Sequence, residues 1–576
     1  MMETAPKRAP SGLGLIYGKV GTTSFTMAVH ADVDLRRNDY VEAPHEQCGI
    51  VLGQVEDIER VTDLSFDRAQ LLSHGEQIEV GEQVTAHISV IGYRDERGVL
   101  LAPRTPFSGG TIVHNASEKL IKEVLGLKQN KATGALLGNL KGFELPVYLD
   151  INDLVQRHIA ILARTGAGKS YVVGVFIEEL IKHGVAVVVL DPHGEYGSLM
   201  HPNDNARDVD NMARYGVKPM RYTDRVVQFT PDPQHQPQAL PLVFDEVNLG
   251  LEDLMELCDI KNNGPHRGIL NRALKQLAKE RQYYNLADVI KTVKADKHPA
   301  RHGLVNQLDY LRALRIFGEP PTRISSLIAE GQCTIITLKG VAPDLQDLVT
   351  SRLVQKIFIG RKLGRIPPLV LVVEEAHTFC PQVGQTRCGP VLKTIAGEGR
   401  KFGMGMCVVS QRPAKIDKNV LSQCGTQVIL KVTNPNDLKA ISSSIEGLTA
   451  GMEENIQRLP TGSALISGGG AATPIIIDVR PRETRHGGQS VSVVSPSAYR
   501  RTMRQLARAE ETPTEEGEEA QGDSHAKETE RAAEDEDEAS PADEGEVDID
   551  ASGPAASAGG SAEVVLETEM DHDAPE

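Results

Sequence analysis

The stretch His158-Ile-Ala-Ile-Leu-Ala-Arg-Thr-Gly-Ala-Gly-Lys-Ser170 decides the fold of this chain. Apolar residues 159–162 predict a buried strand, a glycine-rich turn follows, and the amphipathic segment 171–183 predicts a helix. Such a turn directs backbone N–H groups toward an anion, and the helix N-terminus adds a favourable dipole. A chance glycine-rich turn is the alternative. The strand–turn–helix context instead indicates a phosphate-binding loop, although Ala163 stands where the motif has glycine.

The core of this loop carries groups suited to a nucleotide. Lys169 is expected to place its charge near the β- and γ-phosphates, and the Ser170 hydroxyl is expected to bind Mg²⁺. ATP and Mg²⁺ are therefore the predicted cofactors. The other loop residues expected to contact the nucleotide are Thr165, Gly166, Ala167, Gly168 and Tyr171.

The composition narrows the class of protein. A length of 576 residues predicts two to four domains, and an apolar fraction of 40% is sufficient for large cores. The seven cysteines form no CxxC pair, which argues against a zinc site or a disulfide framework and favours reduced thiols in a cytosol. No apolar run approaches the roughly 20 residues that span a bilayer, so we expect a cytoplasmic protein without a membrane partner.

The charge of the chain is divided unevenly. The formal net charge is −17, which by itself argues against a nucleic-acid partner. Residues 510–576, however, contain 25 acidic and 2 basic residues, whereas residues 1–509 contain 54 acidic and 60 basic residues. A mildly basic body with an acidic tail indicates a polyanionic partner. Two roles are open for the tail: it solubilises the chain, or it occupies a basic channel as a DNA mimic.

Four regions follow from the pattern of apolar runs and turn signals. Residues 1–106 contain evenly spaced short strands and predict a small β-barrel, and residues 107–150 form a connector. In residues 151–485 strands alternate with helices, which predicts an α/β core with a largely parallel sheet covered on both faces. Residues 486–576 form a linker and a polar, acidic tail that we expect to be disordered.

The predicted α/β core has seven strand candidates and one interruption. The candidates are rich in Val, Ile or Leu without clear alternation, as strands buried on both faces should be. They span residues 159–163, 185–190, 333–338, 369–374, 405–410, 427–432 and 474–479. Between about residues 245 and 330 the 3.6-residue spacing of apolar positions predicts a helical insertion instead.

A second chemical constellation is the apolar strand that ends in two carboxylates, Leu369-Val-Leu-Val-Val-Glu374-Glu375. Parallel strands end at the edge of the sheet where ligands bind, so both acids are expected beside the phosphate-binding loop. Glu374, at a position where Asp is commoner, is expected to complete the Mg²⁺ shell. Glu375 is expected to orient and polarise the attacking water. The alternative is a solvated acidic helix start, and the phosphate-binding loop elsewhere in the chain argues against it.

Three further side chains are candidates for roles around the γ-phosphate. Gln411 follows the apolar strand at 405–410 and is expected to sense the γ-phosphate or to position water. An ordinary polar strand end is the alternative. Ring ATPases need a cation, often an arginine from a neighbouring subunit, that stabilises the charge of the transition state. Arg400 and Arg157 are the candidates, and for each the alternatives are a surface cation or a contact to a DNA phosphate.

Five motifs together resemble one family. They are Arg164-Thr-Gly-Ala-Gly-Lys-Ser170, Asp191-Pro-His-Gly-Glu-Tyr196, Glu374-Glu-Ala-His-Thr-Phe379, Glu398-Gly-Arg-Lys-Phe-Gly403 and Ser410-Gln-Arg-Pro413. They resemble the signature set of HerA, the archaeal hexameric DNA translocases of the HerA/FtsK group, and the similarity covers about residues 10–485. The resemblance implies an N-terminal HAS barrel and a RecA-like ATPase core with a helical insertion. It also implies a C-terminal brace on the next subunit, which residues 463–482 match by position.

The resemblance also implies a function. By this resemblance the protein is expected to be an ATP-driven, ring-forming translocase or helicase on double-stranded DNA. It is expected to form a hexamer and to act with a NurA-like nuclease in DNA end resection and double-strand break repair. The implied residues are Lys169 and Ser170 for nucleotide and Mg²⁺, Glu374 and Glu375 as the acidic pair, and Arg157, Arg400 and Gln411 around the γ-phosphate.

Two other functions are open. One is a related ring ATPase for conjugative DNA or protein transport, which ATPase activity stimulated by DNA would distinguish. The other is a nucleotide-gated binding module that barely hydrolyses ATP. The Glu374–Glu375 pair argues against the module, because a switch needs no acid that orients water.

Overall fold

The computed structural model describes residues 12–488, apart from residues 79, 261–263, 315, 446, 447 and 449. The predicted acidic tail and nearly all of the predicted linker lie outside the described residues. Among the described helices, none combines the length and the apolar character that crossing a bilayer requires. In the same part of the chain, all seven cysteines are free and no cluster of His, Cys, Asp and Glu has a metal-binding arrangement.

The strands near the N-terminus form a barrel, as predicted. Their order is β2-β1-β7-β3-β4-β5-β6, and antiparallel pairing of β2 with β5 closes the sheet. Because successive residues of a strand face opposite sides, alternate side chains such as Ile16, Met27 and Val41 fill the interior. The strands are β1 (Gly14–Val20), β2 (Ser24–Val29), β3 (Tyr40–His45), β4 (Gly49–Thr62), β5 (Glu82–Arg94), β6 (Leu100–Leu101) and β7 (Ile112–Asn115).

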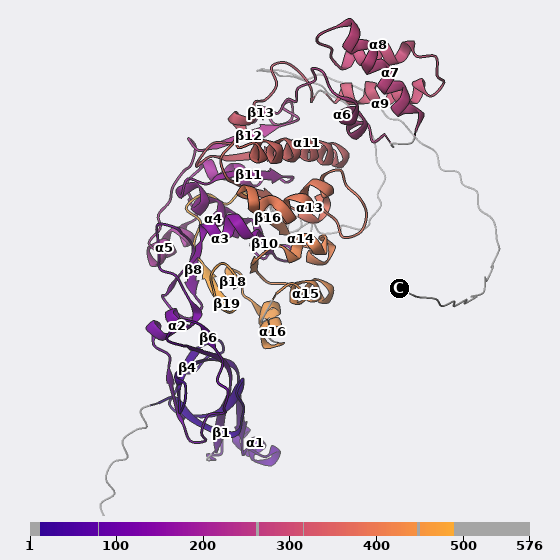
Figure 1. Cartoon of the computed structure of the whole chain (residues 1–576). Helices are drawn as coiled ribbons and strands as arrows, with labels where there is room; N and C mark the ends of the chain where they lie inside the picture. The colour runs from indigo at the N-terminus through magenta and orange to yellow at the C-terminus, as the bar shows by residue number, and fades with distance from the viewer. Residues whose placement is uncertain are drawn as a thin grey trace, which may run out of the picture. The chain divides into compact units, whose positions relative to one another are not determined.

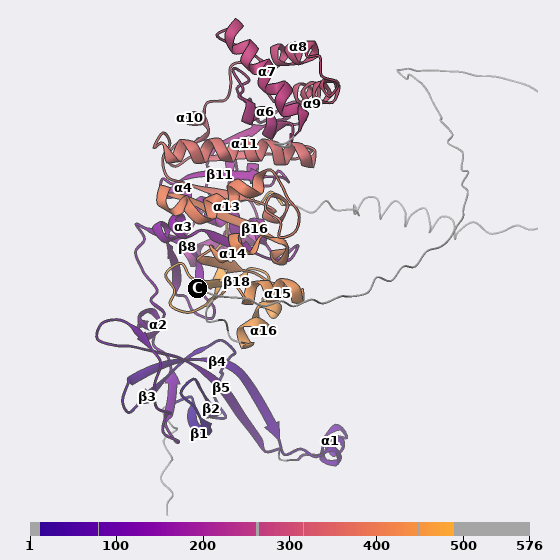
Figure 2. The same cartoon turned by 45° about the vertical axis from the view of Figure 1, so that its right-hand side comes forward.

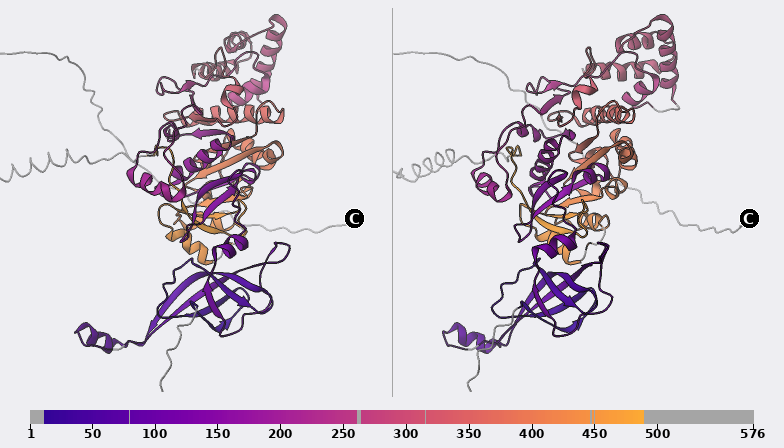
Figure 3. Two further views of the ribbon diagram at one scale, coloured as in Figure 1. Left: turned by 90° about the vertical axis from the view of Figure 1, so that its left-hand side faces the viewer. Right: turned by 60° about the vertical axis from the view of Figure 1, so that its left-hand side comes forward.

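Two features of the barrel depart from the predicted outline. Strand β7 lies beyond residue 106, where the barrel was expected to end, and pairs with both β1 and β3. The hairpin of β4 and β5 continues past the barrel and carries helix α1 (Phe66–Ser73) at its tip (Figures 2 and 3).

The region predicted as a connector contains part of the core sheet. Helix α2 (Glu118–Leu125) begins at Ser117, whose hydroxyl accepts a hydrogen bond from the Leu120 N–H at 3.3 Å. Strands β8 (Gly134–Leu140) and β9 (Pro146–Asp150) then form a hairpin, and β8 pairs with β19 near the end of the described chain. The glycine-punctuated segment is therefore an extension of the sheet, because a distant strand satisfies its backbone hydrogen bonds.

The core is a sheet of twelve strands in the order β13-β12-β14-β11-β15-β16-β10-β17-β18-β19-β8-β9. The eight strands from β13 to β17 are parallel, as predicted, and the last four continue the sheet in antiparallel fashion. All seven predicted strands are present, and β12, β13 and β18 were not predicted. The strands are β10 (Ile159–Leu162), β11 (Ala186–Asp191), β12 (Val226–Thr230), β13 (Leu240–Pro241), β14 (Cys333–Thr337), β15 (Leu369–Val373), β16 (Met404–Ser410), β17 (Thr426–Ile429), β18 (Ser463–Ser467) and β19 (Ile475–Val479).

Helices cover both faces of this sheet (Figure 1). Along β11, Val187 and Val189 enter the apolar cluster on one face, and Val188 and Leu190 enter the cluster on the other. This explains why the central strands read as continuous apolar runs. The helices are α3 (Ile151–Arg157), α4 (Lys169–Lys182), α5 (Ala206–Tyr215), α11 (Pro343–Lys362), α12 (Ala376–Phe379), α13 (Cys388–Glu398), α14 (Lys418–Ser422), α15 (Pro435–Ser442) and α16 (Ala450–Arg458).

The helical insertion is present as predicted. Its helices bury apolar residues at helical spacing, for example Leu286, Val289 and Val293. One of them starts in a capping box, in which Asn285 and Asp288 each accept a backbone N–H of the other. The helices are α6 (Leu251–Leu257), α7 (Pro265–Glu280), α8 (Leu286–Ala295), α9 (Arg301–Ala313) and α10 (Ile324–Leu327).

Candidate functional site at the carboxyl edge of the sheet

Four parallel strands bring the sequence motifs to one edge of the sheet. β16 lies between β10 and β15, and β11 lies on the far side of β15. Their carboxyl ends lead into the glycine-rich loop, the acidic pair, Gln411 and the loop that begins at Asp191. Ligands bind at this edge of parallel sheets, because the loops there converge on a common space.

Two glycines let the loop after β10 turn back on itself. Gly166 has φ 74° and Gly168 has φ 96°, in the left-handed region that disfavours residues with a side chain. Helix α4 begins at Lys169, and Gly168 offers no side chain to cap its first N–H groups. Ala163 is fully buried, and its N–H donates to the Ser410 carbonyl at 3.2 Å. The loop therefore presents uncapped N–H groups at a helix N-terminus, the arrangement that binds anions.

Lys169 joins the loop to the acidic pair. Its Nζ lies 2.9 Å from Oε2 of Glu374 and 2.5 Å from Oε1 of Glu375. Only 13% of the Lys169 side chain is exposed, and the two carboxylates are almost fully buried. Burial alone would lower the pKa of Lys169, but the two carboxylates outweigh it and raise that pKa. The site therefore places the Lys169 ammonium between two buried carboxyl groups.

Glu374 is also held from the direction of β11. Its Oε1 accepts a hydrogen bond from the hydroxyl of Tyr196, and both residues are buried. The carboxylate of Asp191 orders the loop that carries this tyrosine, since it accepts the N–H groups of Gly194 at 2.8 Å and of Tyr196 at 3.1 Å. Burial, with the nearby charge of Glu374, raises the pKa of Asp191 to about 6.

Glu375 adopts the left-handed conformation, with φ 48° and ψ 46°, at the start of α12. Its Oε2 is buried and lies 3.2 Å from Nδ1 of His377, but it makes no hydrogen bond with any residue that the structure describes. Burial alone would raise the pKa of Glu375, but His377 and Lys169 outweigh it and lower that pKa to about 2. Glu375 is therefore an ionised carboxylate with one oxygen available to accept from a bound molecule.

Gln411 connects β16 to the glycine-rich loop. Its Oε1 accepts a hydrogen bond from the Thr165 hydroxyl. The preceding residue, Ser410, is fully buried, and its hydroxyl accepts the Arg412 N–H at 2.9 Å and lies 3.0 Å from Nδ1 of His377. The end of β16 is thus connected to the glycine-rich loop by the hydrogen bond between Gln411 and Thr165. It is connected to His377, which lies beside Glu375, by the contact with Ser410.

A cavity of about 810 Å³ opens over the loop. Its volume falls in the range of small-molecule sites. Of the predicted site residues, its lining contains Thr165, Gly166, Ala167, Gly168, Lys169, Ser170, Tyr171, Glu375 and Gln411. Glu374 is not part of the lining but touches it through Lys169.

Arg157 and Arg400 are not part of this cavity. Arg157 ends α3 just before β10 begins, and its side chain is 59% exposed with Asp153 at 3.9 Å. Arg400 lies in the 3₁₀ turn η2 (Gly399–Phe402) just before β16, and it is exposed. Both therefore lie at the amino ends of parallel strands, the edge opposite to the cavity. Neither can act in the cavity of its own chain.

Several residues of the site were not predicted. Tyr196 belongs to a motif that the sequence made visible, but its bond to Glu374 depends on the pairing of β11 with β15. Asp208 on α5 and His486 near the end of the described chain also line the cavity. Neither Asp208 nor His486 has a local sequence signal that distinguishes it from a surface residue.

Residues 463–482, which the resemblance assigns to a brace on the next subunit, contain β18 and β19, two strands of this chain's own sheet.

The donor set fits a nucleoside triphosphate and its Mg²⁺. The uncapped loop N–H groups and the Lys169 ammonium suit phosphates, and the Ser170 hydroxyl and the Glu374 carboxylate are oxygen ligands of the kind that Mg²⁺ prefers. The Oε2 of Glu375 lies 3.2 Å from Nδ1 of His377 but makes no hydrogen bond within the described residues, so it provides an acceptor for a water molecule.

Comparison with known proteins finds family models that match three regions of the described chain. The family model of the HAS barrel domain matches residues 13–96, that of the HerA helicase central domain matches residues 135–357, and that of the HerA-like C-terminal region matches residues 364–480. The DNA double-strand break repair helicase HerA of Pyrococcus furiosus is 27% identical over 84% of this chain and 96% of that protein.

Two further relatives carry the same name. HerA of Saccharolobus solfataricus is 27% identical over 67% of this chain and 75% of its own length, and HerA of Sulfurisphaera tokodaii is 28% identical over 69% and 78%. The barrel, the core and the C-terminal region are therefore matched in the same order along the chain. This protein belongs to the HerA family of helicases.

Proposed function

We propose that this protein is an ATP-driven translocase or helicase that forms a ring around double-stranded DNA and acts in double-strand break repair. The observation that carries the proposal is the meeting of Lys169 with Glu374 and Glu375 at the edge of the sheet. A nucleotide switch needs the lysine and the loop, but not a second buried carboxylate with an oxygen that makes no hydrogen bond in the described chain. Three relatives that are 27–28% identical to this chain are named as helicases of double-strand break repair.

Nucleotide binding follows from the loop. The N–H groups at the start of α4 and the Lys169 ammonium would hold the phosphates, and Ser170 and Glu374 would hold Mg²⁺. Bound Mg²⁺ supplies positive charge that offsets the charge of the phosphates. Because Lys169 already contacts both carboxylates, a triphosphate competes with them for the same ammonium.

The two acids, Glu374 and Glu375, have different roles in the proposed hydrolysis of ATP. Tyr196 and Lys169 fix Glu374, so its carboxylate is oriented before any ligand arrives. Glu375 has one oxygen engaged by Lys169 and one that lies beside Nδ1 of His377 without a hydrogen bond in the described chain. Its pKa of about 2 makes it a weak base but a permanent hydrogen-bond acceptor, so it orients and polarises the attacking water. Gln411, bonded to Thr165, is placed to report the state of the γ-phosphate to β16.

A ring explains the position of the two arginines. Arg157 and Arg400 precede the adjacent strands β10 and β16, at the edge away from their own cavity. In a head-to-tail ring, that edge of one subunit faces the cavity edge of the next, and an arginine there stabilises transferred charge in trans. We propose a hexamer, with Arg400 and Arg157 as the candidates for this role.

The DNA partner is proposed from two observations. Residues 1–509 carry more basic than acidic residues, and contacts of a channel to phosphates need no base recognition. The relatives' names place them in double-strand break repair. We also propose a NurA-like nuclease as partner, from the resemblance of the motifs, and a cytoplasmic location, in keeping with seven free cysteines.

The test is the rate of ATP hydrolysis by the purified protein with and without linear duplex DNA. The proposal expects hydrolysis that linear duplex DNA stimulates and that Lys169→Ala removes. Hydrolysis that DNA does not change would favour a ring ATPase acting on another substrate. ATP binding without turnover would favour a nucleotide-gated binding module and contradict the assignment of Glu375.

A further inference from the structure

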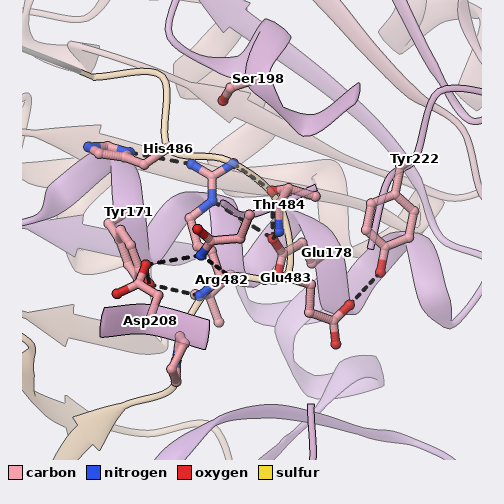
Figure 4. A network of polar contacts seen from close by, with 12 residues as sticks. Tyr171, Glu178, Ser198, Asp208, Tyr222, Arg482, Glu483, Thr484 and His486 are labelled. Atoms are coloured by element: carbon pink, nitrogen blue, oxygen red, sulfur yellow. Dashed lines mark hydrogen bonds and ion pairs between the residues drawn. The ribbon is translucent and has the colours of Figure 1, made fainter. Parts of the chain in front are cut away.

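The last described residues of the chain form a strap, residues 480–488, that follows β19 and crosses helix α4 (Figure 4). Helix α4 is the helix that begins at Lys169. Four of the first five residues of the strap are polar and almost fully buried beside α4. They are Arg480 at 0% exposure, Arg482 at 1%, Glu483 at 3% and Thr484 at 0%. Pro481, His486 and Gly488 of the strap line the cavity. The strap therefore connects a buried polar network to the wall of the nucleotide site.

Two carboxylates of α4 bind the strap. Glu178 accepts hydrogen bonds from Nη1 of Arg480 at 3.0 Å, and from the N–H groups of Glu483 at 3.1 Å and of Thr484 at 2.9 Å. Glu179 accepts Nη2 of Arg480 at 2.8 Å. Such pairs are retained in a buried position only when they are fully hydrogen-bonded, because an unpaired ion there is strongly unfavourable. The strap is thus fixed on α4 by geometry as well as by charge.

Arg482 has a different environment from Arg480. Its guanidinium lies against Gly174 of α4, where an added β-carbon would be 2.4 Å from Cζ. Nη2 donates to the Thr484 hydroxyl at 2.8 Å, Nη1 lies 3.5 Å from Nδ1 of His486, and Nε lies 3.8 Å from Glu178. Nε makes no hydrogen bond within the described residues. The arginine packs against the helix at its one glycine and contacts the cavity residue His486.

The backbone of Arg482 reaches a second cavity residue. Its N–H donates to the hydroxyl of Tyr171 at 2.8 Å, and that hydroxyl donates to Asp208 at 2.8 Å. The rings of Tyr171 and His486 meet edge to face, with centroids 5.5 Å apart. Tyr171, Asp208 and His486 all line the cavity. An aromatic pair with a carboxylate beside it suits the base and the sugar hydroxyls of a nucleoside.

We propose that Arg482 is a positioning residue of the nucleotide site, which locks the strap onto α4 and thereby holds Tyr171 and His486 as the wall that contacts the nucleoside. The inference deepens the proposed function and rests on it. It assigns the strap to the site of its own subunit. The guanidinium lies outside the lining of the cavity, so its loss acts through the wall and affects nucleotide affinity more than the chemical step.

The first test measures the affinity of the purified full chain for a fluorescent ADP analogue, and KM and kcat for ATP. Arg482→Lys keeps the charge but loses the planar fork that reaches Thr484 and His486. We expect affinity to fall and KM to rise by about 10-fold or more, with kcat within about 3-fold, because displaced positioning groups have effects of that order. The matched control is Arg485→Gln in the same strap, where an exposed pair with Asp204 at 2.5 Å is lost. It should bind the analogue like wild type.

The second variant keeps every charge. Gly174→Ala places a methyl group where the Arg482 guanidinium lies, so the arginine must move. We expect the same loss of affinity as for Arg482→Lys, and no additional loss when Gly174→Ala is combined with Arg482→Ala. Hydrogen exchange without nucleotide should show faster exchange of the strap's buried amides, those of Glu483 and Thr484, in both single variants.

The outcomes separate the inference from the function on which it rests. Wild-type affinity in folded Arg482→Lys or in Gly174→Ala would overturn the role of Arg482, and so would a fall in kcat at unchanged KM. If Arg482→Lys does not fold, Gly174→Ala decides. A wild-type protein that binds no adenine nucleotide would contradict the proposed function instead.

Discussion

The ammonium of Lys169 lies 2.5 Å from a carboxylate oxygen of Glu375, although more than 200 residues separate the two along the chain. The lysine belongs to the loop after β10 and the glutamate to the end of β15, with β16 between those strands. The contact shows that the strand order brings the lysine of the glycine-rich motif and the acidic pair to one point. Loss of either should therefore affect ATP turnover in a different way.

Glu375→Gln should separate binding from turnover. The amide keeps the size of the side chain but cannot polarise water as a carboxylate does, so we expect kcat to fall by about 10²- to 10⁴-fold. Binding of ATP should be retained. Lys169→Ala serves as the comparison, since it should lose both binding and turnover. Turnover at the wild-type rate in Glu375→Gln would show that another group orients the water.

Tyr196→Phe should weaken the affinity of the site for Mg²⁺ without removing a metal ligand. The hydroxyl of Tyr196 donates to Glu374, and partners that orient a metal ligand typically change metal affinity by about 10- to 100-fold. We expect the Mg²⁺ concentration for half-maximal ATP hydrolysis to rise by about 10-fold. Tyr284→Phe is the control, because it also removes a partly buried tyrosine hydroxyl. That hydroxyl donates to the Leu249 carbonyl at the helical insertion, away from the site. An unchanged Mg²⁺ titration in Tyr196→Phe would mean that Glu374 does not bind the metal.

Mixing two inactive variants should restore activity if Arg400 acts in trans. Lys169→Ala removes the cavity function of one subunit, and Arg400→Ala removes the cation that a subunit offers to its neighbour. Some interfaces of a mixed ring would combine an intact cavity with an intact arginine and should hydrolyse ATP. The measurement is ATPase rate against the mixing ratio, with co-assembly checked by differently tagged subunits. No recovery in verified mixed rings would exclude Arg400 as a sufficient cation in trans; the same mixture with Arg157→Ala then tests the other candidate.

The stability of the core should fall as the pH drops below about 6.5, because of His158. This residue is 2% exposed; its Nδ1 accepts the Met406 N–H at 3.0 Å, so Nε2 carries the proton and donates to the Ala396 carbonyl at 3.1 Å. Burial lowers the pKa of His158 below its usual 6.5. Below that pH the unfolded chain binds a proton that the folded chain does not, so stability is present above 6.5 and is lost as pH falls, by up to about 1.4 kcal/mol per pH unit.

Urea unfolding at a series of pH values tests this expectation. His158→Gln should show a shallower fall in stability than wild type between pH 6.5 and 5.5. His235→Gln, which changes an exposed histidine paired with Asp232, should leave the slope unchanged. Parallel curves for wild type and His158→Gln would contradict the assignment.

Much of the site was predictable because its chemistry is local. The run from His158 to Ser170 contains a strand, the glycines of the turn and the lysine. The apolar run at residues 369–373 predicts a strand that leads directly to the acids Glu374 and Glu375. Both patterns are confirmed as strands ending at one edge. The helical insertion was equally visible, since its 3.6-residue periodicity needs no information from elsewhere in the chain.

The parts that were missed depend on partners far along the chain. The hairpin of β8 and β9 looked like a glycine-rich connector because the strand that completes it, β19, comes more than 300 residues later. The burial of Arg480 and Arg482 was not predicted, and it depends on Glu178 and Glu179, which face them from α4. Arg157 and Arg400 lie at the opposite edge of the sheet from their own cavity, so they stay candidates for the γ-phosphate of a neighbouring subunit, which one chain by itself does not test.

The sequence by itself determined which groups this protein carries that are proposed to bind phosphate and to orient water, because loop, strand and cap signals act over a few residues. Only the tertiary structure decided which of these groups meet. The order of the strands places Lys169 against Glu374 and Glu375, and the return of the chain across α4 puts Arg482 behind the nucleotide wall. The physical reason is that sheet pairing and buried ion pairs join residues without regard to their separation in sequence, so no local pattern records them.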